Sequence, residues 1–490
     1  MEKKEYFTSR WALVLAVIGM AIGTGNIWRF PRIAAQNGGA AFLIPWIIFL
    51  FIWSIPLLIT ELTFGKSTRF GTLGSFGKLI GKKFTWMGGF IGFCSMAIMF
   101  YYSVVMGWCV KYFFASITGR LGNINSLEYW TRFTETQMQP ILFHFIAITI
   151  GAFIIYLGVV KGIERANKIL IPSLIILIVI GAIRALTLPG AVNGLNFLFN
   201  PEWGRLLDYK VWLNGLTQSA WSTGAGWGLL LTYGVYARKQ EDIVLNSCIA
   251  GLGNNSASLL VGFMIFPAVF SLAPILSLNP EQVIAEVGPA NTGLAFIWIP
   301  TLFAQFPGGQ IFTALFFLAL SFAALSSLVA MIEMVTRNLI DMGLERQWAI
   351  AIVWIGGFIL GLPSAISLEF FGNQDWAWGV GLMVSGFLFA VAVMIYGVKR
   401  FRQELINQVG NDLNIGKWYE YIMKYIIPLE FAVLILWWFW QSVSWTPKTW
   451  WNPLSTYSLG TCLVQWGIVI LLFLAFNGLI YNKIFRTEKG

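Results

Sequence analysis

The chain has 490 residues, of which 57% are hydrophobic and 11% are charged, and its formal net charge is +10. Soluble globular domains carry about 25% charged residues, so this composition excludes that class and predicts an all-α polytopic membrane protein. The basic residues are spread over many short loops instead of being gathered in one segment, which argues against nucleic-acid binding.

Apolar segments long enough to cross a bilayer follow one another along almost the whole chain. A transmembrane helix needs roughly 20 apolar residues, and we therefore expect about twelve spans. They lie near residues 11–36, 40–65, 88–116, 140–160, 165–187, 212–236, 243–275, 308–340, 348–368, 374–398, 420–445 and 457–483. The prolines of the connection at 276–307 predict a structured external loop with short helices.

The loops alternate between rich and poor in lysine and arginine. Those near 66–83, 161–168 and 399–402 are rich, whereas those near 117–139 and 188–211 hold few. Because basic loops stay on the cytoplasmic side, both termini are expected to be cytoplasmic.

Two of the spans contain runs that a membrane helix does not favour. The first span holds residues 19–26 (GMAIGTGN), and the sixth holds residues 222–226 (STGAG). Each glycine weakens a helix by about 1 kcal/mol relative to alanine. Unwound backbone at membrane depth occurs where it is buried in protein or lines a cavity, and two matched interruptions are typical of a secondary transporter.

The two interrupted spans each open a unit of five spans. We expect a first repeat at 1–187, an external loop and second repeat at 188–402, and two further spans at 403–490. Since five crossings is an odd number, the second unit is inverted in the membrane relative to the first. The prediction is a 5+5 inverted repeat with discontinuous helices 1 and 6.

The first interruption offers two kinds of polar backbone group. Unwinding near Gly23 frees N–H groups that bind a carboxylate and carbonyl groups that bind a hard cation such as Na⁺. Asn26 adds a neutral side-chain oxygen. The alternative is close packing of glycines between helices. Because packing explains neither Asn26 nor Arg29, we favour a binding site.

Few other side chains suggest chemistry. His144 is the only histidine, and the four cysteines lie in apolar spans, so the chain is not expected to be an enzyme. Glu61 and Glu333 lie inside spans, where ionisable residues are usually functional. We expect these two acids to hold the broken helices through hydrogen bonds.

Several motifs resemble the neurotransmitter:sodium symporter family, and its bacterial amino-acid members in particular. They are Arg10-Trp11, 25–31 (GNIWRFP), 37–42 (NGGAAF), Tyr101-Tyr102, 161–165 (KGIER), 194–198 (GLNFL), the second interruption, and Ala323 to Ser327. The resemblance covers nearly the whole chain. It implies a sodium-coupled symporter that works by alternating access, expected in a bacterial plasma membrane, with the lipid bilayer and a small amino-acid-like substrate as partners.

Carried onto matching residues, the resemblance implies a central cavity and two sodium sites. The cavity would be lined by Met20, Ala21, Gly23, Thr24, Gly25, Ile98, Tyr102, Trp221, Ser222, Gly224, Trp227, Ser327 and Met331. The first sodium site would consist of Ala21, Asn26, Ser222 and Asn254 with the substrate carboxylate. The second would consist of Gly19, Ile22, Ala323, Ser326 and Ser327. For the two serines, bonding to their own helix is the alternative.

The resemblance also implies an anion site and two gates. Chloride-dependent members have Ser four residues after the seventh-span Asn, and Ser258 follows Asn254 in this way. The chloride ligands would be Gln218, Ser222, Asn254, Ser258 and Trp46. The outer gate would pair Arg29 with Asp375, and the inner gate would use Lys4, Tyr236 and Asp341.

The residues at three cavity positions bear on the substrate. Amine carriers of the family have Asp at the position of Gly23, so Gly23 implies an amino acid. Trp221 and Trp227 narrow the pocket, which favours a small or medium apolar side chain. The alternatives are an N-methylated derivative such as betaine or sarcosine, held by cation–π contacts of about 0.5–2 kcal/mol, and a membrane sensor that does not transport. The sequence does not indicate the oligomeric state.

Overall fold

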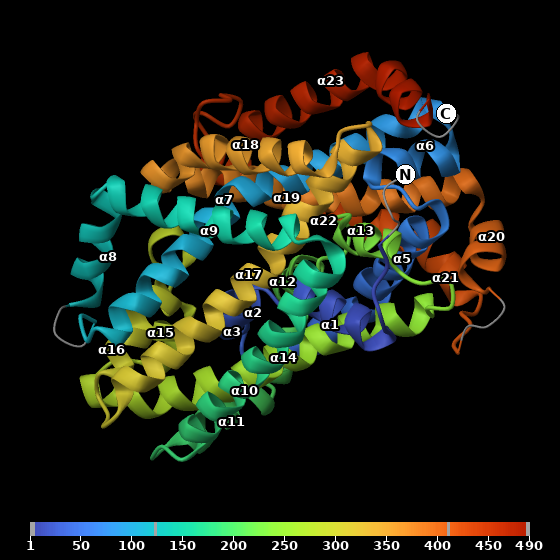
Figure 1. The fold of residues 1–490 in the computed structure, drawn as a ribbon. Helices are drawn as coiled ribbons and strands as arrows, with labels where there is room; N and C mark the ends of the chain where they lie inside the picture. The colour runs from blue at the N-terminus through green and yellow to red at the C-terminus, as the bar shows by residue number, and fades with distance from the viewer. Residues whose placement is uncertain (1–4, 122–124, 409–411, 487–490) are drawn as a thin grey trace.

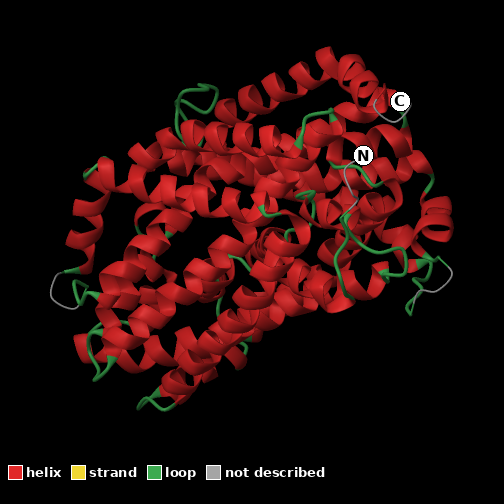
Figure 2. Cartoon of the chain, in the orientation of Figure 1, coloured by secondary structure: helices red, strands yellow, loops and turns green. Residues whose placement is uncertain are grey.

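The computed structural model describes residues 5–121, 125–408 and 412–486. Within these ranges the chain is helical and contains no strand (Figure 2). Ten helical segments there are long and apolar enough to cross a membrane, and two further spans are interrupted. The structure therefore confirms the all-α membrane class and the number of spans expected from the sequence.

The spans follow one another in chain order. The uninterrupted ones are α4 (Ala40–Phe49) continued by α5 (Ile55–Thr68), α7 (Thr85–Ile117), α9 (Met138–Tyr156), α10 (Arg165–Leu186), α14 (Ile243–Leu272), α17 (Gly309–Asp341), α18 (Arg346–Ile366), α19 (Leu368–Tyr396), α22 (Ile427–Trp445) and α23 (Leu459–Arg486). The interrupted ones are α1 (Arg10–Ala21) with α2 (Thr24–Ile27) and α3 (Arg29–Gln36), and α12 (Tyr209–Ser222) with α13 (Leu229–Val235).

Short helices and single helical turns connect or extend the spans. The short helices are α6 (Thr72–Ile80), α8 (Ser126–Glu135), α11 (Ala191–Phe199), α15 (Pro280–Ala285), α16 (Ile299–Phe303), α20 (Val398–Phe401) and α21 (Trp418–Tyr421). Turns of 3₁₀- or π-helix lie at Leu50–Ser54, Lys82–Phe84, Val159–Glu164, Trp203–Leu207, Ala273–Leu276, Pro289–Asn291, Leu294–Trp298, Arg402–Ile406 and Ile422–Ile426.

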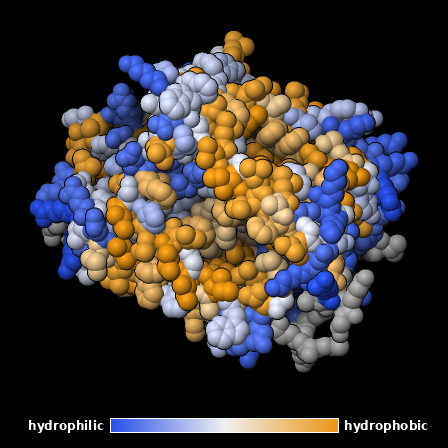
Figure 3. All heavy atoms as spheres, turned by 90° about the horizontal axis from the view of Figure 1, so that it is seen from above, coloured by the Kyte–Doolittle hydropathy of each residue, from blue (hydrophilic) through white to orange (hydrophobic). Residues whose placement is uncertain are grey.

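The spans form one bundle with two polar ends. The N- and C-terminal ends of the described chain lie together at one end of the bundle, and α8 and α16 lie at the other (Figure 1). Figure 3 shows hydrophobic residues over the middle of one face and hydrophilic residues toward both ends. This distribution is the one expected where a band of lipid surrounds the middle of the bundle.

Both predicted interruptions are present, in the first and sixth spans. Between α1 and α2, Ile22 and Gly23 have extended backbone conformations. Between α12 and α13, Gly224, Gly226 and Gly228 have φ angles of +70°, +90° and +77°. Glycine adopts such angles readily, whereas L-amino acids rarely do, so these glycines explain why the sixth span is interrupted after α12. The division at 1–187, 188–402 and 403–490 stays a prediction.

The connection between α14 and α17 folds into short helices, as its prolines predicted. It contains α15 and α16, and it is bonded to α3 at two points. Arg32 Nη1 donates to the Asn291 carbonyl at 2.8 Å, and Gln36 Nε2 donates to the Ala285 carbonyl at 2.7 Å. The loop therefore lies against the second half of the interrupted first span.

Replacement of Gly226 by alanine is expected to lower the melting temperature. A Cβ atom there would lie 2.8 Å from the Cα atom of Gly386, and the left-handed backbone costs an L-residue about 1–2 kcal/mol. Gly356→Ala in α18 is the control, because no atom lies within 4 Å of its added Cβ. Thermal melting of the purified protein in detergent should show a loss for Gly226→Ala alone. Equal melting temperatures would contradict the packing described for the second interruption.

Candidate substrate and cation site

A cavity of about 560 Å³ extends from the two interruptions to the loops at the end of the bundle opposite the termini. Its lining includes Asn291 and Thr292 of one loop and Thr446 and Tyr457 of another. All cavity residues implied by the resemblance border it except Ile98, which is fully buried in α7. The assignment of Ile98 stays a prediction.

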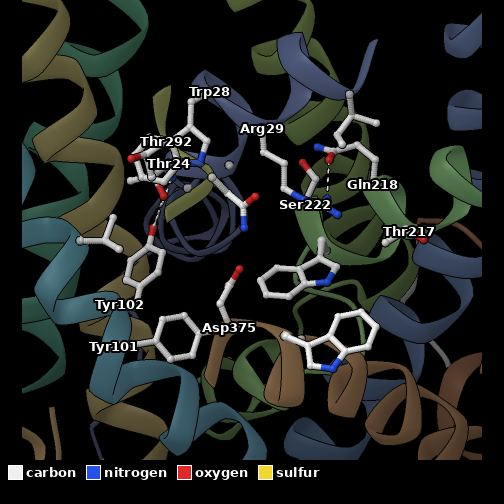
Figure 4. Close-up of a pocket in the computed structure, with 18 of the residues that line it drawn as sticks. Thr24, Trp28, Arg29, Tyr101, Tyr102, Thr217, Gln218, Ser222, Thr292 and Asp375 are labelled. Carbon is white, nitrogen blue, oxygen red and sulfur yellow. Dashed lines mark hydrogen bonds between the residues drawn. The ribbon is translucent and has the colours of Figure 1, made fainter. Parts of the chain in front are cut away.

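Tyr102 and Gly23 define one wall of this cavity. The backbone N–H and the hydroxyl of Thr24 lie 3.3 and 3.4 Å from the Tyr102 hydroxyl, and the dashed lines in Figure 4 mark these bonds. A Cβ atom at Gly23 would lie 3.1 Å from both the Tyr102 hydroxyl and Ser327 Oγ. Glycine at this position therefore leaves room for a ligand group between two hydroxyls.

Beneath the cavity, buried polar side chains from α2, α12 and α14 meet. Asn26 Nδ2 donates to Ser222 Oγ at 3.2 Å, to Asn254 Oδ1 at 2.8 Å and to Ser258 Oγ at 2.8 Å. Asn26 Oδ1 accepts from the Gly23 backbone N–H at 2.9 Å. The bond to Gly23 fixes the orientation of the Asn26 amide and satisfies a backbone donor that the interruption leaves free.

The Asn254 side-chain amide lies beside two backbone carbonyl groups of the interrupted helices. Its end nearest to them is 2.8 Å from the Ser222 carbonyl oxygen and 3.0 Å from the Ala21 carbonyl oxygen, and the NH₂ group on that side would donate to both, whereas the amide oxygen on that side would join them as a third oxygen ligand. Neutral oxygens are the ligands that hard cations prefer, so the donor set fits Na⁺. Asn26 presents its NH₂ group here, and its role as an oxygen ligand stays a prediction.

The residues implied for a second sodium site lie where α17 passes the end of α1. Ser326 Oγ donates to the Ala323 carbonyl of its own helix at 3.0 Å. Ser327 Oγ instead reaches across to the Met20 carbonyl of α1 at 3.3 Å. Gly19 and Ile22 flank Met20 at the end of α1. The second site stays a prediction.

On the side away from the termini, the cavity is lined by the residues of the predicted outer gate. Arg29 donates to Gln218 Oε1 at 2.5 Å and its guanidinium lies 5.4 Å from the centre of the Trp221 ring. Asp375 extends into the cavity beside Tyr101 (Figure 4). Within the described part of the chain, no ion pair of 4.0 Å or less joins Arg29 to Asp375. The two residues of the predicted outer gate therefore form no ion pair in this conformation.

The side that carries the termini is closed by buried ion pairs. Glu333 accepts from the Tyr236 hydroxyl at 2.5 Å and pairs with Arg346 at 2.7 Å. Asp341 pairs with Arg337 at 2.6 Å and accepts from the Gly71 N–H at 2.5 Å. Two of the predicted inner-gate residues thus take part in this closure. Lys4, the third, lies outside the described residues.

The segment before α1 adds to the closure. The Phe7 N–H donates to the Tyr236 carbonyl at 3.1 Å, and the Phe7 ring meets the Tyr233 ring edge-on at 5.9 Å between centroids. Phe7 is buried. It therefore covers the end of α13 on the side of the termini.

The two intramembrane acids are bonded as the sequence predicted. Glu61 is fully buried in α5, and its carboxylate accepts from the backbone N–H groups of Gly226 at 2.6 Å and Leu231 at 3.4 Å. These donors belong to the second interruption and the start of α13. Glu333 reaches the residue that follows α13, Tyr236. Both acids therefore connect a neighbouring span to the broken sixth helix.

Sequence reasoning missed two arginines. Arg32 lines the cavity and bonds to the loop at Asn291, and Arg346 neutralises Glu333. Arg32 follows Arg29 by three residues, a spacing that places both on one helix face, and this signal was available in the sequence. The partner of Arg346 depends on tertiary contacts that no local pattern reports.

An interrupted pair of helices, a central cavity and a buried oxygen cluster define a membrane transporter of the broken-helix class. The sequence model of the sodium:neurotransmitter symporter family matches residues 4–139 and 132–481. The chain belongs to this family, which consists of transporters and not of enzymes, and it is a sodium-dependent symporter of the membrane.

Relatives support the same assignment. An uncharacterised sodium-dependent transporter of Methanocaldococcus jannaschii is 30% identical over 459 residues, covering 88% of this chain and 90% of the relative. The sodium-dependent serotonin transporter of Drosophila melanogaster is 27% identical over 538 residues, covering 99% and 84%. The crystal structure of MhsT in complex with L-phenylalanine superposes with a TM-score of 0.76 at 31% identity, covering 89% of this chain and 99% of MhsT.

Arg346→Gln is expected to loosen the closed side. Loss of a buried ion-pair partner costs about 3–5 kcal/mol, because Glu333 would stay buried without its cation. Hydrogen–deuterium exchange measured by mass spectrometry should accelerate in the peptides that contain Phe7 and Tyr236. Arg400→Gln, which removes an exposed pair with Glu404, should leave these peptides unchanged, since surface pairs contribute about 0–1 kcal/mol. Unchanged exchange in a folded Arg346→Gln protein would refute a closing role for this pair.

Proposed function

We propose that the protein couples inward movement of Na⁺ to uptake of an apolar amino acid. The observation that carries this proposal is that Ala21 and Ser222 belong to both sites. They line the cavity, and their carbonyl oxygens lie 3.0 and 2.8 Å from the Asn254 side-chain amide. A substrate carboxylate in the cavity would therefore lie beside the cation and complete its coordination, so that each ligand strengthens the binding of the other.

The charges around the cavity favour a substrate that carries a carboxylate. Among the described residues that line it, Asp375 is the only acid, whereas Arg29 and Arg32 are both basic. A lone amine would find no counter-charge near Gly23. The carboxylate would be met at this wall by the Tyr102 hydroxyl.

The remaining wall suits an apolar side chain. The Trp221 and Trp227 rings meet at 84° with centroids 5.7 Å apart. A Cβ atom at Gly224 would have only one atom within 4 Å, in the Met20 side chain at 3.5 Å, so there is room for a substrate side chain beside Gly224. The relative MhsT was solved with L-phenylalanine, a ligand of this chemistry. A second candidate is an N-methylated amino acid, because indole faces also bind quaternary ammonium groups.

Transport would proceed by alternating access. With Arg29 and Asp375 apart, Na⁺ and substrate would enter from the side opposite the termini. Closure would bring Arg29 and Asp375 together, and opening of the other side would separate the Glu333 and Asp341 pairs. We place both termini in the cytoplasm of a bacterial cell, where the membrane potential supplies about 2.3 kcal/mol per charge per 100 mV.

Uptake into proteoliposomes tests this proposal. Radiolabelled L-phenylalanine should accumulate when an inward Na⁺ gradient is imposed and should not accumulate in equal K⁺. Competition by the other amino acids, betaine and sarcosine would then define the substrate. Dissipation of the gradient with an ionophore is the control. Binding that depends on Na⁺ without accumulation would refute transport and favour the membrane sensor.

We further propose that an anion supports the first cation site. The indole N–H of Trp46 and the amide NH₂ of Gln218 are buried and have no hydrogen-bond partner in the described part of the chain. Both belong to the chloride set implied by the resemblance, and unpaired buried donors favour a bound acceptor. Ser258 places no fixed negative charge near the cation, so chloride would supply it.

Uptake should therefore fall when chloride is replaced by gluconate at constant Na⁺. Ser258→Glu is expected to make uptake independent of chloride, because the carboxylate provides the missing negative charge. Initial rates in the two media check both expectations. Equal Na⁺-driven uptake by the unmodified protein in chloride and in gluconate would rule the anion site out.

A further inference from the structure

Arg32 in α3 is a second arginine that lines the cavity, beside the predicted gate residue Arg29. Its side chain is buried, with 7% exposed, yet no carboxylate of the described residues lies within 4.0 Å of it. Instead, Arg32 Nη1 donates to the Asn291 carbonyl at 2.8 Å. A buried charge without a counter-charge is costly, so this guanidinium favours a carboxylate partner.

One edge of the Arg32 guanidinium remains available for such a partner. The guanidinium donors form a planar fork, and a carboxylate binds the edge formed by Nε and Nη2 through two parallel hydrogen bonds. Nε is buried and has no hydrogen-bond partner in the described part of the chain, whereas Nη1 is occupied by the Asn291 carbonyl. Arg32 can therefore bind a carboxylate without releasing the external loop.

Asp375 is the carboxylate that suits this edge. It is the only acid among the described residues that line the cavity, and its charge interacts with both Arg29 and Arg32. Arg29 is already engaged, because it donates to Gln218 Oε1 at 2.5 Å and lies over the Trp221 ring. Arg29 would have to leave these partners to bind Asp375, whereas Arg32 would not have to leave its own.

The Asn291 carbonyl belongs to a turn that packs against the helix of Asp375. The turn at Pro289–Asn291 contacts α19, and Ala290 and Asn291 have φ angles of +51° and +61°. Alanine rarely adopts such an angle, so the turn depends on surrounding contacts to keep this conformation. The bond from Arg32 is one of them, and it connects α3 through the turn to α19.

We propose that Arg32 is a positioning residue of the outer gate. When the side opposite the termini closes, the Nε and Nη2 edge of Arg32 binds the Asp375 carboxylate while Nη1 keeps the Asn291 carbonyl. The turn is thereby held over the cavity, and Asp375 is shared between Arg29 and Arg32. This inference rests on the closure put forward in the proposed function. It adds to the Arg29–Asp375 pair a second cation that also holds the external loop.

Dissociation of radiolabelled L-phenylalanine from the purified protein in Na⁺ tests the inference. Arg32→Gln removes the edge that binds the carboxylate, so the bound amino acid should leave about ten- to a hundredfold faster, as expected for hydrogen bonds to a charged group. Gln36→Ala is the matched control, because Gln36 bonds the same loop at the Ala285 carbonyl and does not line the cavity. It should leave the rate unchanged.

A double-mutant cycle with Asp375→Asn shows whether Arg32 acts through this carboxylate. Arg32→Gln should accelerate dissociation in the unmodified protein and have little effect in the Asp375→Asn background. Arg32→Lys keeps the charge without the fork, so its rate should lie between those of the unmodified protein and Arg32→Gln. Thermal melting in K⁺ shows which variants are folded. Should Arg32→Gln fail to fold, Arg32→Lys carries the same expectation with a smaller acceleration.

Several results would overturn one or both proposals. An unchanged rate in Arg32→Gln, or the same acceleration with and without the Asp375 carboxylate, would refute the pairing and leave sodium-coupled uptake standing. Equal acceleration by Gln36→Ala and Arg32→Gln would also refute it, because attachment of the loop alone would then set the rate. If L-phenylalanine does not bind, the amino acid that binds best in Na⁺ replaces it. Binding of no amino acid would refute the proposed substrate class, and the role of Arg32 with it.

Discussion

The structure depends on one constraint, namely that unwound backbone at membrane depth must find polar partners inside the protein. Lipid offers none, and each unsatisfied backbone group there costs several kcal/mol. The carboxylate of Glu61 meets this demand at the second interruption by accepting from Gly226 and Leu231. Asn26 Oδ1 meets it at the first by accepting from Gly23. Both partners bind N–H groups, and the carbonyls of Ala21 and Ser222 lie beside the Asn254 side-chain amide instead.

The two ends of the pathway are held by different kinds of contact. On the side of the termini, Glu333 and Asp341 each have an arginine within 2.7 Å, and both carboxylates are buried. On the other side, Arg29 is bonded to a neutral amide and its acidic partner is apart. Charge pairs in a buried environment are strong only when both members meet. In this conformation, and within the described residues, the charge pairs are therefore formed only on the side of the termini. If that side opened, an Arg29–Asp375 pair on the other side would have to compensate for their loss.

Much of the fold could be predicted because its signals are local. Long apolar runs define the spans, and Gly224, Gly226 and Gly228 stop the sixth helix wherever the rest of the chain lies. The bonding role of Glu61 could also be inferred, since an acid in lipid needs a donor. The pairing of Arg346 with Glu333 could not, because two separate elements bring them together.

The orientation of the Asn254 side-chain amide cannot be predicted from the sequence. In isolation, its two orientations are equivalent. Three neighbours from α1, α2 and α12 give the two ends of Asn254 different surroundings. Because Ser222 contributes to the cavity and to the oxygen cluster, a change in this amide would alter the ion and the substrate together. Coupling in such a site would therefore follow from shared ligands and would need no distant signal between separate pockets.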